Sequence, residues 1–280
     1  MAKPLSNTET NASFLQNPEQ MTKLKETAFK AARQAGSLLM ERVGKIKSVD
    51  YKSAFNIVTD VDKASESLII SILKSDFPHT DILAEESGAH NTGDKQRWII
   101  DPLDGTTNYT HSYPFFSVAI AFEENGEVIL GVVYNPYVNE MFWAVKGQGA
   151  FLNNEPIKVS KNDALAKSLL ATGFPADTKG SRYNNIKSFS TVTDLCHGVR
   201  RDGSAALDLC FVACGRLDGF WELKLSPWDT AGGVLIVREA GGKVSGLEGE
   251  DFDIYSGHVF ASNGLIHQEV IDVLAKTREV

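Results

Sequence analysis

An apolar run that ends in two carboxylates constrains this chain more than any other stretch. The run Trp98–Ile100 is followed by Asp101 and Asp104. Such a run predicts a buried strand, and Gly105 with Thr106–Asn108 predicts the first turn of a helix after it. Close carboxylates bind hard cations such as Mg²⁺, and free N–H groups at a helix N-terminus bind anions. The stretch therefore predicts a site for a metal ion and a phosphate group, with simple helix capping as the alternative.

Length and charge narrow the class of protein. The 280 residues suffice for one large domain or two closely joined halves, and a formal net charge of −8 argues against wholesale nucleic-acid binding. No apolar run approaches the roughly 20 residues that a membrane-spanning helix needs. Residues 1–21 are polar and predict a flexible tail rather than a secretory signal. The odd number of cysteines, without metal-binding spacing, predicts free thiols and a reducing, cytoplasmic location.

The first half of a single domain over 22–280 is predicted to carry helices over an antiparallel sheet, and it spans about 22–152. Helices are expected over 22–43 and from Asp60 or Asp62 to Pro78. Strands are expected over Asp81–Ala84, Phe116–Glu123, Glu127–Tyr134, Glu140–Val145 and Ala150–Leu152. Asn125-Gly126 between two of these runs predicts a hairpin. Glu85 follows the first strand, either in a solvated turn or, if this strand neighbours Trp98–Ile100, as a third carboxylate of the site.

The second half, about 153–280, is predicted to be of α/β type, so that the whole chain is α+β. Strands are expected over Ser168–Ala171, Gly198–Arg201, Asp218–Leu223 and Val259–Ala261, and helices over Arg182–Leu195, Gly203–Cys214, Pro227–Ala240 and 264–276. Asp229 stands at the start of one helix, where an N-cap is the simpler interpretation. Glu222 lies among apolar residues, either on the polar face of a strand or as a ligand-binding group.

These segments together resemble the inositol monophosphatase family. Asp101–Thr107 is similar to the first signature of that family, and Trp228–Gly233 with Glu239–Gly242 is similar to the second. Glu85–Ser87 matches the glutamate-bearing segment before the first signature, and Lys52 with Asn56–Asp62 matches the N-terminal segment. The order and the intervals agree over nearly everything after residue 22.

The resemblance implies a layered αβαβα sugar-phosphatase fold, usually dimeric, and a Mg²⁺-dependent phosphomonoesterase that Li⁺ inhibits. One metal would be held by Glu85, Asp101 and the carbonyl of Leu103, and a second by Asp101, Asp104 and Asp229. A third, weaker ion would lie near Glu85 through water. The N–H groups of Gly105 and Thr106 would hold the phosphate.

The resemblance also implies hydrolysis by a metal-activated water. Glu85 and Thr106 would orient and deprotonate this water, with Lys52 or Asp62 ordering the water network, and the leaving group would take a proton from water near Asp104 or Asp229. Sugar hydroxyls would meet Gly203, Ser204, Ala205 and Glu222.

This pattern favours inositol 1-phosphate as substrate over the compounds that relatives use, which are fructose 1,6-bisphosphate, histidinol phosphate, NADP and 3′-phosphoadenosine phosphate. A haloacid-dehalogenase mechanism would need a nucleophilic aspartate where this chain has Pro102. Some bacterial relatives also act in RNA-polymerase complexes, which makes a regulatory role the alternative from another class.

Overall fold

The computed structural model describes residues 13–46, 48–53, 56–90, 95–175 and 184–278, without the side chains at 49, 51–53, 56–57 and 278. Its first half is built on an eight-stranded sheet in the order β10-β9-β8-β7-β6-β5-β3-β4. The elements are η1 (Phe14–Gln16), α1 (Pro18–Arg42), β1 (Val49–Ser53), β2 (Asn56–Thr59), α2 (Asp60–Asp76), β3 (Asp81–Ala84), β4 (Gly88–His90), β5 (Gln96–Asp104), α3 (Thr106–Thr110), β6 (Ser117–Glu124), β7 (Glu127–Asn135), β8 (Glu140–Val145), β9 (Ala150–Leu152) and β10 (Glu155–Ile157). The larger sheet therefore extends beyond Leu152, where we expected the first half to end.

The second half is built on a five-stranded mixed sheet in the order β12-β11-β13-β15-β14. Strand β11 is parallel to β12 and β13, while β15 is antiparallel to β13 and β14. The elements are η2 (Leu165–Lys167), β11 (Leu169–Thr172), α4 (Ile186–Thr193), β12 (Gly198–Arg200), α5 (Ala205–Ala213), β13 (Gly219–Leu223), α6 (Pro227–Glu239), β14 (Lys243–Ser245), β15 (His258–Ser262) and α7 (His267–Arg278).

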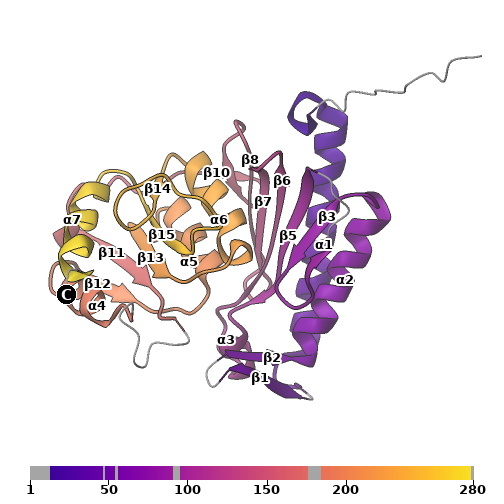
Figure 1. Cartoon of the computed structure of the whole chain (residues 1–280), viewed down its shortest axis with the longest axis horizontal. Helices are drawn as coiled ribbons and strands as arrows, with labels where there is room; N and C mark the ends of the chain where they lie inside the picture. The colour runs from indigo at the N-terminus through magenta and orange to yellow at the C-terminus, as the bar shows by residue number, and fades with distance from the viewer. Residues whose placement is uncertain (1–12, 47, 54–55, 91–94, 176–183, 279–280) are drawn as a thin grey trace, which may run out of the picture.

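Helices and sheets alternate in five layers (Figure 1). Helices α1 and α2 pack on the outer face of the larger sheet, α5 and α6 lie between the two sheets, and α4 packs against α7 beyond the smaller sheet. Helix α6 contacts β6, β7 and β8 on one side, and α5 contacts β13 and β15 on the other. This order confirms the predicted α+β class and its αβαβα layers.

Local sequence signals account for most element bounds. Strands β3, β8 and β9 have the predicted limits, and the predicted hairpin forms with positive φ at both Asn125 and Gly126. Helix α1 begins at Pro18 rather than 22, because Asn17 caps it and proline suits the first helical position. Residues 13–21, which we expected in the tail, thus carry η1 and the first turn of α1, and 1–12 lie outside the described residues.

Strand β5 runs past Ile100, where we expected it to end, and reaches Asp104. It pairs with β6 at Asp101↔Ala119 and again at Asp104↔Ser117, so β5 carries one residue more than β6 between these pairs. This is a β-bulge. In a regular strand, side chains at positions i and i+3 point to opposite faces. The extra residue changes this alternation, and it allows Asp101 and Asp104 to face the same site.

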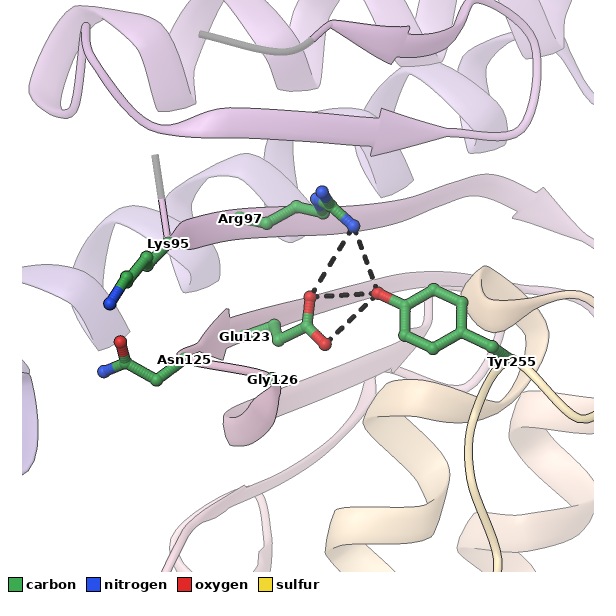
Figure 2. A pocket seen from close by; sticks show the side chains of 6 residues that line it. All are labelled: Lys95, Arg97, Glu123, Asn125, Gly126 and Tyr255. Carbon is green, nitrogen blue, oxygen red and sulfur yellow. Dashed lines mark hydrogen bonds and ion pairs between the residues drawn. The ribbon is translucent and has the colours of Figure 1, made fainter. Parts of the chain in front are cut away.

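The segment before β15 is bound to the larger sheet by Tyr255 (Figure 2). The Tyr255 hydroxyl donates to the Glu123 carboxylate at 2.9 Å, and Arg97 donates to the same hydroxyl at 3.2 Å. Glu123 on β6 is only 5% exposed, so these two partners stabilise a charge that would be costly without them. The contact joins segments 132 residues apart in sequence.

Helix α5 is apolar on nearly all sides, because it lies between the two sheets. Cys196, Cys210 and Cys214 are all free thiols, as predicted, but of the three only Cys210 is fully buried where we expected buried thiols. None of the helices in the described ranges combines the length and the apolar character needed to cross a bilayer.

Candidate active site

Four carboxylates lie close together where β3 and β5 end and α6 begins: those of Glu85, Asp101, Asp104 and Asp229. Strands β3 and β5 are its parallel pair, with Ala84 opposite Ile100. Glu85 therefore follows β3 beside Asp101, and its backbone N–H donates to Ile100 O at 3.2 Å. This adjacency was the condition under which we expected Glu85 to join the two aspartates. Asp101 and Asp104 are 2% and 8% exposed, whereas Glu85 and Asp229 are partly exposed.

Burial raises the pKa of three of these acids, and neighbouring charges raise the pKa of Asp101 and Asp229 further. Burial raises the pKa of Asp101 well above its usual range, and the charges of Glu85, Asp104 and Asp229 raise it further. Burial and then the charge of Asp104 raise the pKa of Asp229 to about 8. Burial raises the pKa of Asp104 to about 6, although hydrogen bonds from Ser204 and from the N–H groups of α5 oppose the shift. Ionised carboxylates in this arrangement need a counter-charge, which a divalent cation supplies.

The donor set therefore fits a hard cation in its chemistry. Within the described ranges, no three His, Cys, Asp or Glu side chains are arranged so that they hold a metal ion by themselves. A backbone oxygen or water would have to complete the coordination. The Leu103 carbonyl is positioned nearby: its oxygen lies 3.0 Å from Thr106 Oγ1, and Leu103 N donates to Asp101 Oδ1 at 3.0 Å.

Asp229 is placed by the N-terminus of α6. Its Oδ2 accepts from Ser226 N at 2.6 Å in a capping box, and Pro227 begins the helix. The N-cap is therefore Ser226 and not Asp229, which was the simpler interpretation from the sequence: Asp229 is the third residue of the helix and reaches back to the Ser226 N–H. This leaves its other carboxylate oxygen for the site. Helix α6 comes close to the sheet at Gly131, where an added Cβ would lie 2.5 Å from Gly232 O. The close approach explains Gly131, whereas Gly233 of the second signature faces α5, where an added Cβ would lie 2.7 Å from Leu209 Cβ.

Glu66 holds the turn that carries Glu85, and the sequence analysis did not single it out. Its two carboxylate oxygens accept from Glu86 N at 2.8 Å and from Ser87 N at 2.9 Å. Glu66 lies on α2 and is 4% exposed. In a sequence, a glutamate within a helix is usually a solvated residue. Only its place on the apolar face of α2, three and seven positions before Ile69 and Leu73, indicated burial.

Thr106 and Asp62 form a hydrogen-bonded pair beside the acids. Thr106 Oγ1 lies 2.9 Å from Asp62 Oδ1, and Asp62 also caps α2 through Thr59 N at 2.8 Å. Asp62 is fully buried, and burial raises the pKa of its carboxyl group. The N-cap of α2 is Thr59, and not Asp60 or Asp62; Asp62 completes the capping box from the third helical position while it also contacts Thr106. Lys52 lies in β1, but its side chain is outside the described residues.

Gly105 and Gly203 bring two loops together at the start of α3. Gly105 has φ +92°, and an added Cβ would lie 3.0 Å from Phe115 O and 3.1 Å from Gly203 O. Asn108 Nδ2 donates to Phe115 O and to Asp202 O, both at 2.7 Å. Asn108 thereby joins the first signature to the second half of the chain.

The segment Gly203–Ala205, which we expected to meet the sugar hydroxyls, lies beside Asp104. Ser204 Oγ donates to Asp104 Oδ2 at 2.6 Å, and Ala206 N donates to the same oxygen at 2.8 Å. Ser204 also caps α5. Asp104, the last residue of β5, thus binds the N-terminus of α5 in the other half of the chain.

Two further acids lie near this junction. Glu222 on β13 is partly exposed, and burial followed by the charges of Asp229 and Asp104 raises its pKa to about 8. Asp208 on α5 is 1% exposed and was not singled out from the sequence. Burial and the charges of Asp202 and Glu222 raise the pKa of Asp208 well above its usual range, and among the described residues its Oδ1 has no hydrogen-bond partner. The signal that could have found Asp208 in the sequence was an aspartate within an apolar helical run.

Comparison with known proteins gives the class of this protein. The solved structure of an inositol monophosphatase from Anabaena (Nostoc) sp. PCC 7120 is similar with a TM-score of 0.84 and 44% identity, covering 91% of this chain and 96% of that chain. The αβαβα fold is that of a phosphatase, a phosphoric monoester hydrolase.

The family model described as "Inositol monophosphatase family" matches residues 20–279, and the chain belongs to that family. An inositol-1-monophosphatase of Synechocystis sp. is 45% identical over 263 residues, which cover 93% of this chain and 92% of that protein. A "Putative Nus factor SuhB" of Neisseria meningitidis serogroup B is 40% identical over 252 residues, which cover 89% of this chain and 97% of that protein. The family is generally metal-dependent.

Proposed function

We propose that this protein hydrolyses inositol 1-phosphate, or a closely similar polyol phosphate, to the free polyol and phosphate with Mg²⁺ as cofactor. The observation that carries the proposal is the convergence of Asp101, Asp104 and Asp229 beside Glu85, where the charges of the other three acids raise the pKa of Asp101. The relative from Synechocystis sp., whose printed name is inositol-1-monophosphatase, supports the choice of substrate.

We expect this donor set, completed by backbone and water oxygens, to hold two Mg²⁺ ions. The first would be held by Glu85, Asp101 and the Leu103 carbonyl, and the second by Asp101, Asp104 and Asp229 together with water. A third, weaker ion near Glu85 through water stays part of the proposal. When bound, the cations neutralise phosphate charge and make the attacking water more acidic. Asp101 would contribute to both sites, and the hydrogen bond that Leu103 N donates to its Oδ1 orients this carboxylate.

The pair Thr106 and Asp62 is suited to orient the attacking water. The Thr106 hydroxyl donates a hydrogen bond to Asp62 Oδ1. A lone pair of Thr106 Oγ1 can then accept a hydrogen bond from the water. Glu85, partly exposed beside Asp101, would accept the proton as the water adds to phosphorus. Lys52 would take part in ordering the water network.

The phosphate and the polyol would be held by different parts of the site. The N–H groups of Gly105 and Thr106 at the start of α3 would bind phosphate oxygens. As the ester bond breaks, the alkoxide would take a proton from water near Asp104 or Asp229. Gly203, Ser204, Ala205 and Glu222 would face the polyol hydroxyls, with the Glu222 carboxylate as acceptor.

A panel of substrates tests this proposal directly. Phosphate release is measured with inositol 1-phosphate, fructose 1,6-bisphosphate, histidinol phosphate, NADP and 3′-phosphoadenosine phosphate, with Mg²⁺ and again with Li⁺ added. We expect a preference for inositol 1-phosphate and inhibition by Li⁺. A preference for another compound would overturn the substrate assignment, and release without Mg²⁺ would overturn the metal mechanism.

A regulatory role is the second candidate, and the relative named "Putative Nus factor SuhB" favours it. In this case the protein would associate with RNA polymerase rather than bind RNA by a strongly basic surface, since the net charge is −8. Copurification of the cytoplasmic protein with polymerase subunits would support this role. A homodimer is part of the proposal, and light scattering in solution tests it.

A further inference from the structure

The Glu222 carboxylate lies against the backbone of Gly173, at the end of the neighbouring strand. A Cβ added to Gly173 would lie 2.0 Å from Glu222 Oε1 and 2.2 Å from Oε2. Such distances are far below van der Waals contact, so no side chain fits at position 173 while Glu222 keeps its position. The carboxylate therefore occupies the volume where a side chain would begin.

The sheet register explains this contact. Strands β11 and β13 are parallel, with Thr172 opposite Trp221. The next residues, Gly173 and Glu222, are therefore neighbours as the two strands end. In a sheet, neighbouring side chains at the same register position point to the same face, and a side chain at 173 would compete with Glu222 for one place.

Asn185 ties the two strand ends together on either side of this contact. Its Nδ2 donates to Gly173 O and to Thr172 Oγ1, both at 2.7 Å, and its Oδ1 accepts from Trp221 Nε1 at 2.7 Å. Thr172 Oγ1 in turn donates to Trp221 O at 2.6 Å. Trp221 Nε1 can only donate and Gly173 O can only accept, so the amide of Asn185 has one possible orientation. Asn185 is 6% exposed, which keeps water from replacing these bonds.

We propose that Gly173 and Asn185 are positioning residues that set substrate specificity, by fixing the Glu222 carboxylate where it accepts hydrogen bonds from the hydroxyls of a polyol phosphate. The inference rests on the proposed function, because it takes Glu222 as the group that meets the substrate. Gly173 leaves room for the carboxylate, and Asn185 holds Gly173 and Trp221 at a constant separation. Without this support, Glu222 would project into the space of the polyol ring.

The test compares a polyol phosphate with a substrate that has no hydroxyls for Glu222. We would measure kcat/KM for inositol 1-phosphate and for 4-nitrophenyl phosphate with saturating Mg²⁺. For Gly173→Ala we expect a loss of about 10- to 100-fold with inositol 1-phosphate, the range for a hydrogen bond to a charged group. With 4-nitrophenyl phosphate we expect a change of less than about threefold, because Glu222 makes no hydrogen bond to that substrate.

A compensating variant keeps the test independent of folding defects. Glu222→Asp draws the carboxylate back by one methylene, so Gly173→Ala/Glu222→Asp should recover at least about fivefold of the inositol 1-phosphate activity that Gly173→Ala loses. The matched control is Gly198→Ala on β12 of the same sheet, where the nearest group is the movable Arg200 side chain at 3.1 Å. We expect this control to resemble wild type with both substrates. For Asn185→Asp, which sets a carboxylate against Gly173 O, we expect the same selective loss as for Gly173→Ala.

The outcomes separate this inference from the proposed function. Equal losses with both substrates, or no recovery in the double variant, would overturn the positioning role and leave the phosphatase mechanism intact. If the wild-type protein released phosphate from neither substrate, the proposed function would fail and the inference with it. If it released phosphate from both without preferring the polyol, the role of Glu222, and with it the inference, would be refuted.

Discussion

Glu66→Ala should weaken Mg²⁺ binding although Glu66 is not among the proposed ligands. The carboxylate of Glu66 accepts from Glu86 N and Ser87 N at 2.8 and 2.9 Å, and these two bonds order the turn directly after Glu85. Hydrogen bonds to a charged group contribute roughly 1.5–3 kcal/mol each when buried. Since Ser87 is exposed and water can replace part of this interaction, about 1 kcal/mol for each bond is the better estimate here.

The sum of about 2 kcal/mol corresponds to a factor of about 30 in an equilibrium constant. This is the expected cost of ordering the turn before Glu85 can act as a ligand. We therefore expect the half-saturating Mg²⁺ concentration to rise about 30-fold for Glu66→Ala, with little change in kcat at saturating Mg²⁺. Glu66→Gln keeps one acceptor oxygen for one of the two N–H groups, and we expect an intermediate rise.

The assay is phosphate release over a Mg²⁺ titration, with hydrogen exchange at residues 85–88 as the structural readout. Glu26→Ala is the control, because Glu26 is an exposed glutamate on α1. The reasoning is refuted if Glu66→Ala shifts the half-saturating concentration by less than threefold while the amides of 85–88 keep their protection. A lowered kcat at saturating Mg²⁺ would also contradict it, since it would mean that Glu66 acts on the chemical step.

Three further predictions concern the acids and the packing that places them. For Asp101→Asn we expect phosphate release to fall by more than about 100-fold. The free energy of urea unfolding in EDTA should be unchanged or higher, because a neutral amide ends the repulsion among the acids. Near-wild-type turnover at saturating Mg²⁺ would contradict the two-metal assignment. The folded pKa of Asp229 is about 8 against an unfolded value near 4, so its stabilisation is present below about pH 4 and is lost as the pH rises to 8. Thermal unfolding in EDTA should therefore begin at lower temperature at pH 9 than at pH 6, and Mg²⁺ should restore more stability at the higher pH. Gly131→Ala should lower the free energy of unfolding by about 1–3 kcal/mol and also lower activity, since an added Cβ would lie 2.5 Å from Gly232 O. Gly198→Ala is the control. An unaltered unfolding midpoint for Gly131→Ala would contradict this prediction, because it would show that α6 moves freely.

Local patterns were sufficient for most of the fold, and their failures have physical causes. Apolar runs, the Asn125-Gly126 hairpin and the proline at the start of α6 predicted the elements to within a few residues. Strands β1, β2, β4, β10 and β14 were missed, because each is at most five residues long and mixes polar with apolar residues, so that no apolar run stands out. The extension of β5 to Asp104 was missed because proline and two acids resemble a turn. Only the pairing with β6 shows that these residues continue the strand as a bulge.

The residues of the candidate site divide in the same way. The sequence by itself determined the chemistry: the acids at the ends of apolar runs, the Gly-Thr after them and the second Asp-bearing helix start are all chosen by residue type and spacing. Distances between segments depend on strand order and register, which a one-dimensional pattern does not contain. The tertiary structure alone decided that Glu66 supports the Glu85 turn, that Asp104 meets the start of α5, and that Gly173 leaves room for Glu222. Each is a contact between residues 20 to 102 positions apart, or one set by the register of two strands.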